Sequence, residues 1–466
     1  YLALSLFPHL KHKRVGAFFS SIAYLYAPTR IVDSFKSAEP LIPSVFLPLF
    51  LSFVIVGARK RKLIYALYAG LVTFPLFGIF PIATWQVSIF LVCGLLIFSI
   101  IRLGSAVRRK HGWDEFFFLC KFYSILIGLS FFVNLYWIVP FAQQQSYYFS
   151  SASAFEPNFF FNKWSVLPNV FRLLDYWGFY NGYVPYAFEY TNNPLIIVLT
   201  YALPLLAFSA VLLDKSKSTL LLTAITVVTI FFAKGNNSPC GQLYESLVKF
   251  PLLKVLYSTG SIMLYLMPLG YSLLIGVTCA ELIRRIGVNR SVKNRSLKLP
   301  KSQIILGVIL LLVIAFNSWP LITGDVLRNY YEPNEYGVRL PDDYFITNSW
   351  LNSQEGNYKV FLIPSVMSYI GTRWGLQGTS DFYRLIYTKP VITGTGTPYG
   401  WISEREDYDI VRIAYEIPYS NPLIHKVNLS STLLGDIDSI NWTSYQQDTV
   451  ILDFDHPMNS KSSVLW

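Results

Sequence analysis

The chain has 466 residues, of which 53% are hydrophobic and 14% are charged, and its mean hydropathy is +0.41. That composition is too apolar for a single soluble core and indicates a membrane protein. The net charge of +11 would also suit a nucleic-acid-binding protein. However, the Lys and Arg residues stand in short clusters between apolar runs, a pattern that indicates membrane topology and argues against nucleic acid as a partner.

Ten apolar segments follow one another along residues 1–322, and the longer ones reach across about 30 Å of hydrocarbon at 1.5 Å per residue. We therefore predict an all-α membrane domain of about ten transmembrane helices over 1–322. The segment that begins at Tyr1 is too short to span a bilayer, so we expect further sequence before it, and Trp466 also ends the chain without a closing feature. The predicted segments are 1–8, 15–28, 40–57, 63–80, 84–101, 117–141, 194–213, 219–233, 261–283 and 303–322.

Basic residues occupy every second loop between these segments. Because short cytoplasmic loops are enriched in Lys and Arg, we expect the clusters to face the cytoplasm. The intervening loops, chiefly 142–193 and 234–260, then lie outside together with Tyr1 and the tail from residue 323. The predicted location is the plasma membrane, with many spans and an extracytoplasmic C-terminal domain. The basic clusters are Lys11 to Arg14, Arg59 to Lys62, Arg102 to Lys110, Asp214 to Lys217 and Arg284 to Lys301.

The tail, residues 323–466, differs from the rest in charge and in pattern. Its net charge is −7, whereas residues 1–322 carry +18. Runs rich in β-branched and aromatic residues, Tyr358 to Ile363 and Thr449 to Phe454, alternate with Gly, Pro and Asn and predict strands. Helical periodicity appears near Tyr344 to Leu351 and Asp407 to Tyr415. We therefore predict an extracytoplasmic α+β domain over 323–466.

Two sequons in this tail, at Asn428 and Asn441, predict glycosylation sites on the exposed side. The four Cys and five His residues are scattered without the spacing of a metal site, so no metal ligand is predicted.

Candidate binding residues stand in the two longer outer loops. In loop 142–193, Arg172, Asp175 and Trp177 lie among many aromatic residues. This composition suits either an interfacial aromatic belt or a groove for a lipid-linked sugar. In the next outer loop, Lys234 ends an apolar segment before Gly-Asn-Asn-Ser, and Lys254 follows. Lys234 is either a snorkelling lysine or, with backbone N–H groups beside it, part of an anion site.

The stretch Lys234 to Pro251 reads Lys-Gly-Asn-Asn-Ser-Pro-Cys-Gly-Gln-Leu-Tyr-Glu-Ser-Leu-Val-Lys-Phe-Pro and precedes an apolar segment near Ser261. It resembles a passage of large multi-spanning GT-C glycosyltransferases, in particular the arabinofuranosyltransferase-like and bacterial YfhO-like membrane proteins. The run Ala23 to Pro28 is similar to an early segment of that group. Pro341 to Leu351, followed by Val360 to Pro364, looks like the start of its outer domain.

The resemblance implies transfer of a sugar from a polyprenyl-phosphate donor to an envelope acceptor on the outer face. Such a transfer needs a carboxylate that deprotonates the acceptor hydroxyl, often with a divalent metal against the donor phosphate, so the cofactor stays open. The family's catalytic acid usually follows the first span, a segment that we expect before Tyr1. Asp33 and Glu39 belong to a later loop, and the catalytic residue is left unassigned.

Two alternatives remain beside this enzyme of an archaeal or bacterial cell envelope. The first is a non-enzymatic membrane subunit whose outer domain anchors or scaffolds a surface complex, with envelope proteins as partners. The second is a transporter, which the lack of internal repeats and the scarcity of charge within the segments argue against.

Overall fold

The structure is a computed structural model, and the chain forms two compact units. The first comprises Tyr1–Gln145 and Glu156–Leu327, and the second Ser146–Phe155 and Arg328–Trp466. The residues that the structure describes are 1–29, 38–78, 81–108, 110–143, 164–175, 186–250, 253, 256, 265–288, 301–327, 339–354, 360–361, 370–371, 377–378, 386–389, 391–392, 426–427, 440–445 and 449–454.

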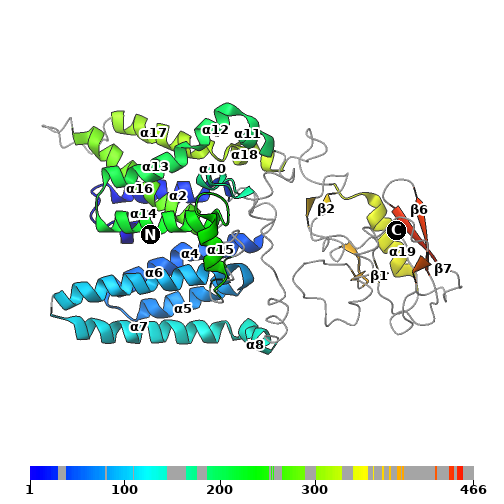
Figure 1. The fold of residues 1–466 in the computed structure, drawn as a ribbon, viewed down its shortest axis with the longest axis horizontal. Helices are drawn as coiled ribbons and strands as arrows, with labels where there is room; N and C mark the ends of the chain where they lie inside the picture. The colour runs from blue at the N-terminus through cyan, green and yellow to red at the C-terminus, as the bar shows by residue number, and fades with distance from the viewer. Residues whose placement is uncertain are drawn as a thin grey trace. The chain divides into compact units, whose positions relative to one another are not determined.

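The first unit is a bundle of α-helices (Figure 1). Its helices are α1 (Leu2–Leu6), α2 (Lys13–Leu25), α4 (Ala38–Lys60), α5 (Ile64–Phe77), α6 (Pro81–Arg108), α7 (Gly112–Val133), α8 (Leu135–Gln143), α10 (Leu167–Phe171), α11 (Ala187–Asn192), α12 (Pro194–Thr200), α13 (Ala202–Leu213), α14 (Lys217–Ala233), α15 (Gly241–Val248), α16 (Met267–Val288), α17 (Lys301–Phe316), α18 (Trp319–Thr323) and the 3₁₀ turn η5 (Asp325–Leu327).

Helices occupy all ten predicted apolar segments, and in the part of the chain that the structure describes four helical stretches are long and apolar enough to cross a membrane. The prediction of a helical membrane domain is confirmed with these four candidate spans, and the larger number of about ten stays a prediction. The four stretches are Ile42–Lys60, Val87–Arg108, Gly112–Val133 and Pro194–Leu213, and three shorter apolar helices cover Ile64–Phe77, Lys217–Ala233 and Lys301–Phe316.

Helices α2 and α16 cross at the centre of the first unit with their backbones in close approach. A Cβ atom added to Gly16 would lie 2.9 Å from the carbonyl oxygen of Gly276, and one added to Gly276 would overlap the hydroxyl of Ser20. Small residues one turn apart allow helices to approach this closely in membranes. Helix α16 is buried along almost its whole described length, so it forms the core around which the other helices pack.

Polar contacts draw the predicted basic loops together at one end of the first unit, here called the basic end. His9, before α2, contacts Asp214, after α13, at 3.0 Å. Arg61, after α4, lies 3.9 Å from Glu115 at the start of α7. The short helices α8, α10, α11, α15 and α18 gather at the opposite end, as Figure 1 shows.

The position of Tyr1 differs from the expectation. It lines one pocket together with Arg59 and Lys60 of the basic end, although the alternation of charged loops placed it on the other side. The reason is that α1 has only five residues and packs against the last turns of α4 instead of crossing the bundle.

The second unit contains α19 (Asp342–Ser353), where the sequence predicts a helix near Tyr344 to Leu351. Strand β7 coincides with the predicted strand Thr449 to Phe454, and it pairs antiparallel with β6 from Thr449↔Tyr445 to Phe454↔Ile440. The predicted helix Asp407 to Tyr415 lies outside the described residues, and an independent α+β domain stays a prediction. The strands are β1 (Val360–Phe361), β2 (Ile370–Gly371), β3 (Gln377–Gly378), β4 (Val391–Ile392), β5 (Lys426–Val427), β6 (Ile440–Tyr445) and β7 (Thr449–Phe454), paired β1-β4, β2-β3 and β5-β6-β7.

Candidate functional site

A buried turn at the end of α10 carries two of the candidate residues, Arg172 and Asp175. Leu173 has a φ of 58°, a left-handed conformation that costs a residue with a Cβ roughly 1–2 kcal/mol. The amide of Leu174 closes the turn by donating to the Asn169 carbonyl oxygen at 2.9 Å. All four residues from Arg172 to Asp175 are at most 5% exposed. The local sequence therefore holds two ionisable groups inside the protein in a strained backbone.

The Arg172 guanidinium ties this turn to the next helices in the chain. Its Nε donates to the Thr200 hydroxyl at 2.7 Å, and an Nη donates to the Tyr190 carbonyl oxygen. It also lies 5.7 Å from the ring centroid of Tyr201. These acceptors are neutral, so the described contacts hold the cation in place by hydrogen bonds and an aromatic face.

Tyr190 continues this network toward α18. Its hydroxyl donates to the Asn317 carbonyl oxygen at 2.7 Å, and its ring stacks on Trp319 with a centroid distance of 6.2 Å. The Nε1 of Trp319 and the Oδ1 of Asn317 are buried without a hydrogen-bond partner. Buried polar groups are nearly always hydrogen-bonded, so these two exceptions are places where a polar ligand or a water could bind.

Asp175 differs from Arg172 in having no protein partner. Its side chain is 2% exposed, and neither carboxylate oxygen accepts a hydrogen bond from another residue. Burial raises the pKa of this carboxyl to about 7, because a charged carboxylate is poorly stabilised away from water, although the backbone N–H of Asp175 itself lies close enough to lower the pKa slightly. The carboxylate interacts electrostatically with Tyr271 of α16, whose hydroxyl donates to the Phe171 carbonyl oxygen at 3.2 Å.

Lys234 caps the end of α14 and folds back on the turn that follows it. Its Nζ donates to the carbonyl oxygens of Asn237 at 2.7 Å and Gly235 at 3.2 Å, and it lies 4.9 Å from the Phe231 ring centroid. Two amides of the proposed anion-binding turn are also engaged, since Gly235 donates to Phe232 and Asn237 to Lys234. Burial lowers the pKa of the Lys234 ammonium.

The elements that carry Arg172 and Lys234 touch, because α10 packs against α14. The two cations nevertheless have separate acceptors. Arg172 donates to Tyr190 in α11 and Thr200 in α12, whereas Lys234 donates to a carbonyl oxygen of its own turn. A shared anion site therefore stays a prediction. The other two candidates of these loops, Trp177 and Lys254, lie outside the described residues, as does Asn428. Asn441 belongs to β6, where its backbone pairs with Lys426 and Asp453.

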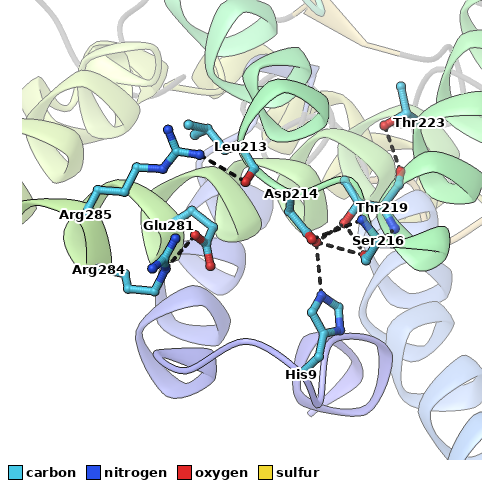
Figure 2. Close-up of polar contacts among 9 residues, drawn as sticks. All are labelled: His9, Leu213, Asp214, Ser216, Thr219, Thr223, Glu281, Arg284 and Arg285. Atoms are coloured by element: carbon cyan, nitrogen blue, oxygen red, sulfur yellow. Dashed lines mark hydrogen bonds and ion pairs between the residues drawn. The ribbon is translucent and has the colours of Figure 1, made fainter. Parts of the chain in front are cut away.

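A second polar cluster, which the sequence did not single out, lies at the basic end (Figure 2). The Asp214 carboxylate accepts hydrogen bonds from Thr219 at 2.6 Å, Ser216 at 2.9 Å and His9 at 3.0 Å. Burial raises the pKa of Asp214, but these hydrogen bonds outweigh it and lower the pKa overall. Arg285 donates to the Leu213 carbonyl oxygen at 3.3 Å. This cluster joins three basic loops, and its acid is fully satisfied.

The resemblance to GT-C enzymes raised the question of a divalent metal. Among the residues that the structure describes, no group of three or more His, Cys, Asp or Glu side chains comes together to hold one.

Comparison with known proteins adds one finding to this geometry. A family model described as "Alpha-(1->3)-arabinofuranosyltransferase, N-terminal GT-C domain" matches residues 9–385. That range includes the turn Arg172 to Asp175, the Lys234 turn and α19. Searches among curated proteins and among solved structures returned no match.

Proposed function

The chain belongs to the family of alpha-(1->3)-arabinofuranosyltransferase N-terminal GT-C domains, and from this we propose that it transfers a sugar from a polyprenyl-phosphate donor to an envelope acceptor. The family match, which covers most of the chain, is the observation that carries the proposal. By the family's description, the sugar is arabinofuranose and the new linkage is α-(1→3). The acceptor is then a glycan with a free 3-hydroxyl.

We place this transfer at the end of the first unit opposite the basic end, on the outer face of the plasma membrane. The contacts His9–Asp214 and Arg61–Glu115 join the basic loops at the basic end. Short loops rich in Lys and Arg face the cytoplasm. The buried turn and the aromatic network lie at the other end, where a lipid-linked sugar on the outer leaflet would approach. In this arrangement residues 323–466 form an extracytoplasmic α+β domain, with Asn428 and Asn441 as its glycosylation sites.

Lys234 and Arg172 are the cations that we assign to the donor phosphate, with Trp177 and Lys254 from the same loops. A cation away from bulk water attracts phosphate more strongly than an exposed one does, because the effective dielectric constant is lower. In the absence of substrate the Lys234 ammonium is held by the two carbonyl oxygens of its turn. Binding of phosphate would exchange those neutral acceptors for a charged one, which forms the stronger hydrogen bond.

The test uses the purified full chain in lipid nanodiscs. A short-chain polyprenyl-phosphoryl-arabinofuranose serves as donor, and an arabinofuranoside with a free 3-hydroxyl as acceptor. We expect an α-(1→3)-linked product by mass spectrometry. Lys234→Ala should weaken donor binding at least about tenfold, while Lys249→Ala, a nearby surface variant, should leave it unchanged. A folded protein that neither binds this donor nor forms product would instead favour the scaffolding subunit.

A further inference from the structure

A cavity at the basic end combines cations with apolar side chains. It lies between α1 and the last turns of α4 and has a volume of about 320 Å³, which is within the range of small-molecule sites. Arg59 and Lys60, the last two residues of α4, line it and are exposed. The other lining residues are Tyr1, Leu4, Ser5 and Val56. None of these described lining residues is acidic, so the cavity presents positive charge beside hydrocarbon.

The acid nearest in the network of this end is already used by other arginines. The Glu115 carboxylate pairs with Arg102 and lies 3.9 Å from Arg61. Arg59 adds a further guanidinium, whose charge is repelled by that of Arg102. Among the described residues, neither Arg59 nor Lys60 has an ion pair or a side-chain hydrogen bond. An anion in the cavity would therefore meet two cations that have no competing acceptor and would offset their repulsion.

The place of these cations along α4 indicates which anion fits. The stretch Ile42–Lys60 is long and apolar enough to cross a membrane, and Arg59 and Lys60 stand at its end. Long basic side chains at the end of a span reach the headgroup level of the bilayer. An arginine binds phosphate through two parallel hydrogen bonds, and a lysine binds it as a point charge. Basic pockets between membrane helices on the cytoplasmic side are sites for anionic lipid headgroups.

We propose that this cavity binds an anionic phospholipid of the cytoplasmic leaflet, with its phosphate on Arg59 and Lys60 and its hydrocarbon against Leu4 and Val56. The apolar wall favours a lipid over a soluble phosphate, because a soluble anion would gain nothing from it. The bound lipid contacts both α1 and α4 and so holds the short helix against the span. This proposal is independent of the sugar transfer, since it concerns the opposite end of the first unit.

The ordinary alternative is that Arg59 and Lys60 snorkel to the membrane surface without a defined partner. The two readings differ in what they expect of other cations. A snorkelling pair acts through the total charge of this end, so any two exposed lysines there would be equivalent to it. A site acts through these two residues and through the cavity beside them.

The test titrates the purified full chain, in neutral detergent micelles, with dioleoylphosphatidylglycerol, dioleoylphosphatidylcholine or soluble glycerol phosphate, and native mass spectrometry counts the bound molecules. We expect one phosphatidylglycerol to bind at least about tenfold more tightly than phosphatidylcholine, and glycerol phosphate not to bind at the same concentrations. The double variant Arg59→Gln/Lys60→Gln should lose at least about tenfold in affinity for phosphatidylglycerol. The matched control Lys215→Gln/Lys217→Gln removes the same charge from exposed positions at this end and should stay within about twofold of the wild type.

A second variant tests the cavity itself. Ser5→Phe keeps both cations but fills the space between α1 and α4, and it should also weaken binding of phosphatidylglycerol. The double variant should fold, because both side chains are exposed and the loss of Arg59 relieves its repulsion with Arg102. An unchanged unfolding midpoint in lipid-free detergent checks this.

Each other result overturns the proposal. Equal binding of phosphatidylcholine would show that the phosphate charge is not recognised, and equally tight binding of glycerol phosphate would assign the cavity to a soluble anion. The same loss in both double variants would leave Arg59 and Lys60 as snorkelling cations. Full binding by Ser5→Phe would place the lipid outside the cavity. None of these results bears on whether the protein transfers sugar, so the proposed function is tested separately.

Discussion

Replacing Asp175 with Asn should make the protein more stable relative to wild type as the pH rises. The pKa of this carboxyl is about 7 in the folded chain against a usual value of 3.8. The folded state therefore holds its proton more tightly than the unfolded state does. Wild-type stability decreases as the pH rises from about 4 to about 7, because the native carboxyl must lose its proton without a partner. Asn has the same shape and no charge to desolvate.

The size of the effect follows from the two pKa values. Each pKa unit corresponds to about 1.4 kcal/mol. Integrating proton binding between the two states gives a penalty of about 4 kcal/mol at pH 8 and about 2 kcal/mol at pH 5. Any pH-independent difference between a buried amide and a buried acid is the same at both values. The stability gap between Asp175→Asn and wild type should thus widen by about 2–3 kcal/mol from pH 5 to pH 8.

The assay is equilibrium unfolding in mixed detergent micelles, followed by tryptophan fluorescence at several pH values. Asp214→Asn provides a comparison of opposite sign, because the pKa of Asp214 is lowered by its hydrogen bonds. Asp214 stabilises the fold above its unfolded pKa, and this contribution is lost as the pH falls through the folded value, so the cost of Asp214→Asn should shrink on acidification. If the free energies of unfolding of Asp175→Asn and wild type changed with pH in parallel, the Asp175 carboxyl would not be buried without a partner, and the reasoning would be wrong.

Three further predictions concern packing, the buried cation and topology. Gly276→Leu should destabilise the protein by several kcal/mol or prevent folding, because any Cβ there meets α2. Gly94→Leu should be nearly neutral, because nothing lies within 4 Å of a Cβ at that position. Similar unfolding midpoints for the two variants would contradict the close approach of α2 and α16. Arg172→Met should cost about 2–4 kcal/mol in the same unfolding assay by leaving buried acceptors unsatisfied, and an unchanged midpoint would show that those contacts contribute nothing. In intact cells, an impermeant thiol reagent should label a single Cys at position 245 and spare one at position 59; the reverse pattern would overturn the orientation.

The basic clusters are the part of the fold that the sequence predicts best. The alternation of basic and non-basic loops along the chain predicts that the loops near Lys11, Arg59, Arg102, Asp214 and Arg284 lie on one side. The structure joins members of this set by direct contacts at one end, such as His9–Asp214 and Arg61–Glu115. The grouping is predictable because it depends on Lys and Arg near each segment end, a property that survives errors in the exact helix boundaries.

The crossing of α2 and α16 was missed although its signal is in the sequence. Gly16 and Ser20 are four residues apart, as are Gly276 and Ala280, which is the spacing of small residues at close helix crossings in membranes. The sequence does not say which two helices pair, because many segments of this chain carry small residues. Apolar composition alone also does not separate a core helix such as α16 from a lipid-facing one.

The candidate site was predicted only in its outline. Arg172 and Asp175 were chosen because they stand among aromatic residues in one outer loop, and nothing in that pattern says whether the two side chains contact each other. The structure separates them: Arg172 turns to Thr200 and Tyr190, and Asp175 is left alone. Between them Leu173 is left-handed. A left-handed leucine has no local sequence signature, because its conformation is imposed by the packing around it.

The buried acids of the first unit's described residues are satisfied to different degrees, and Asp175 differs from the others. At the basic end, Asp214 is held by three side chains and Glu115 by two arginines, which is what stability alone selects. At the other end, the same chain leaves Asp175 buried in a strained turn with an arginine nearby that points elsewhere. A substitution to Asn or Leu would remove the charge penalty without changing the turn. A buried carboxyl that no other residue satisfies weakens the free protein, and proteins that sit just above their stability threshold carry such costs at positions where activity needs them.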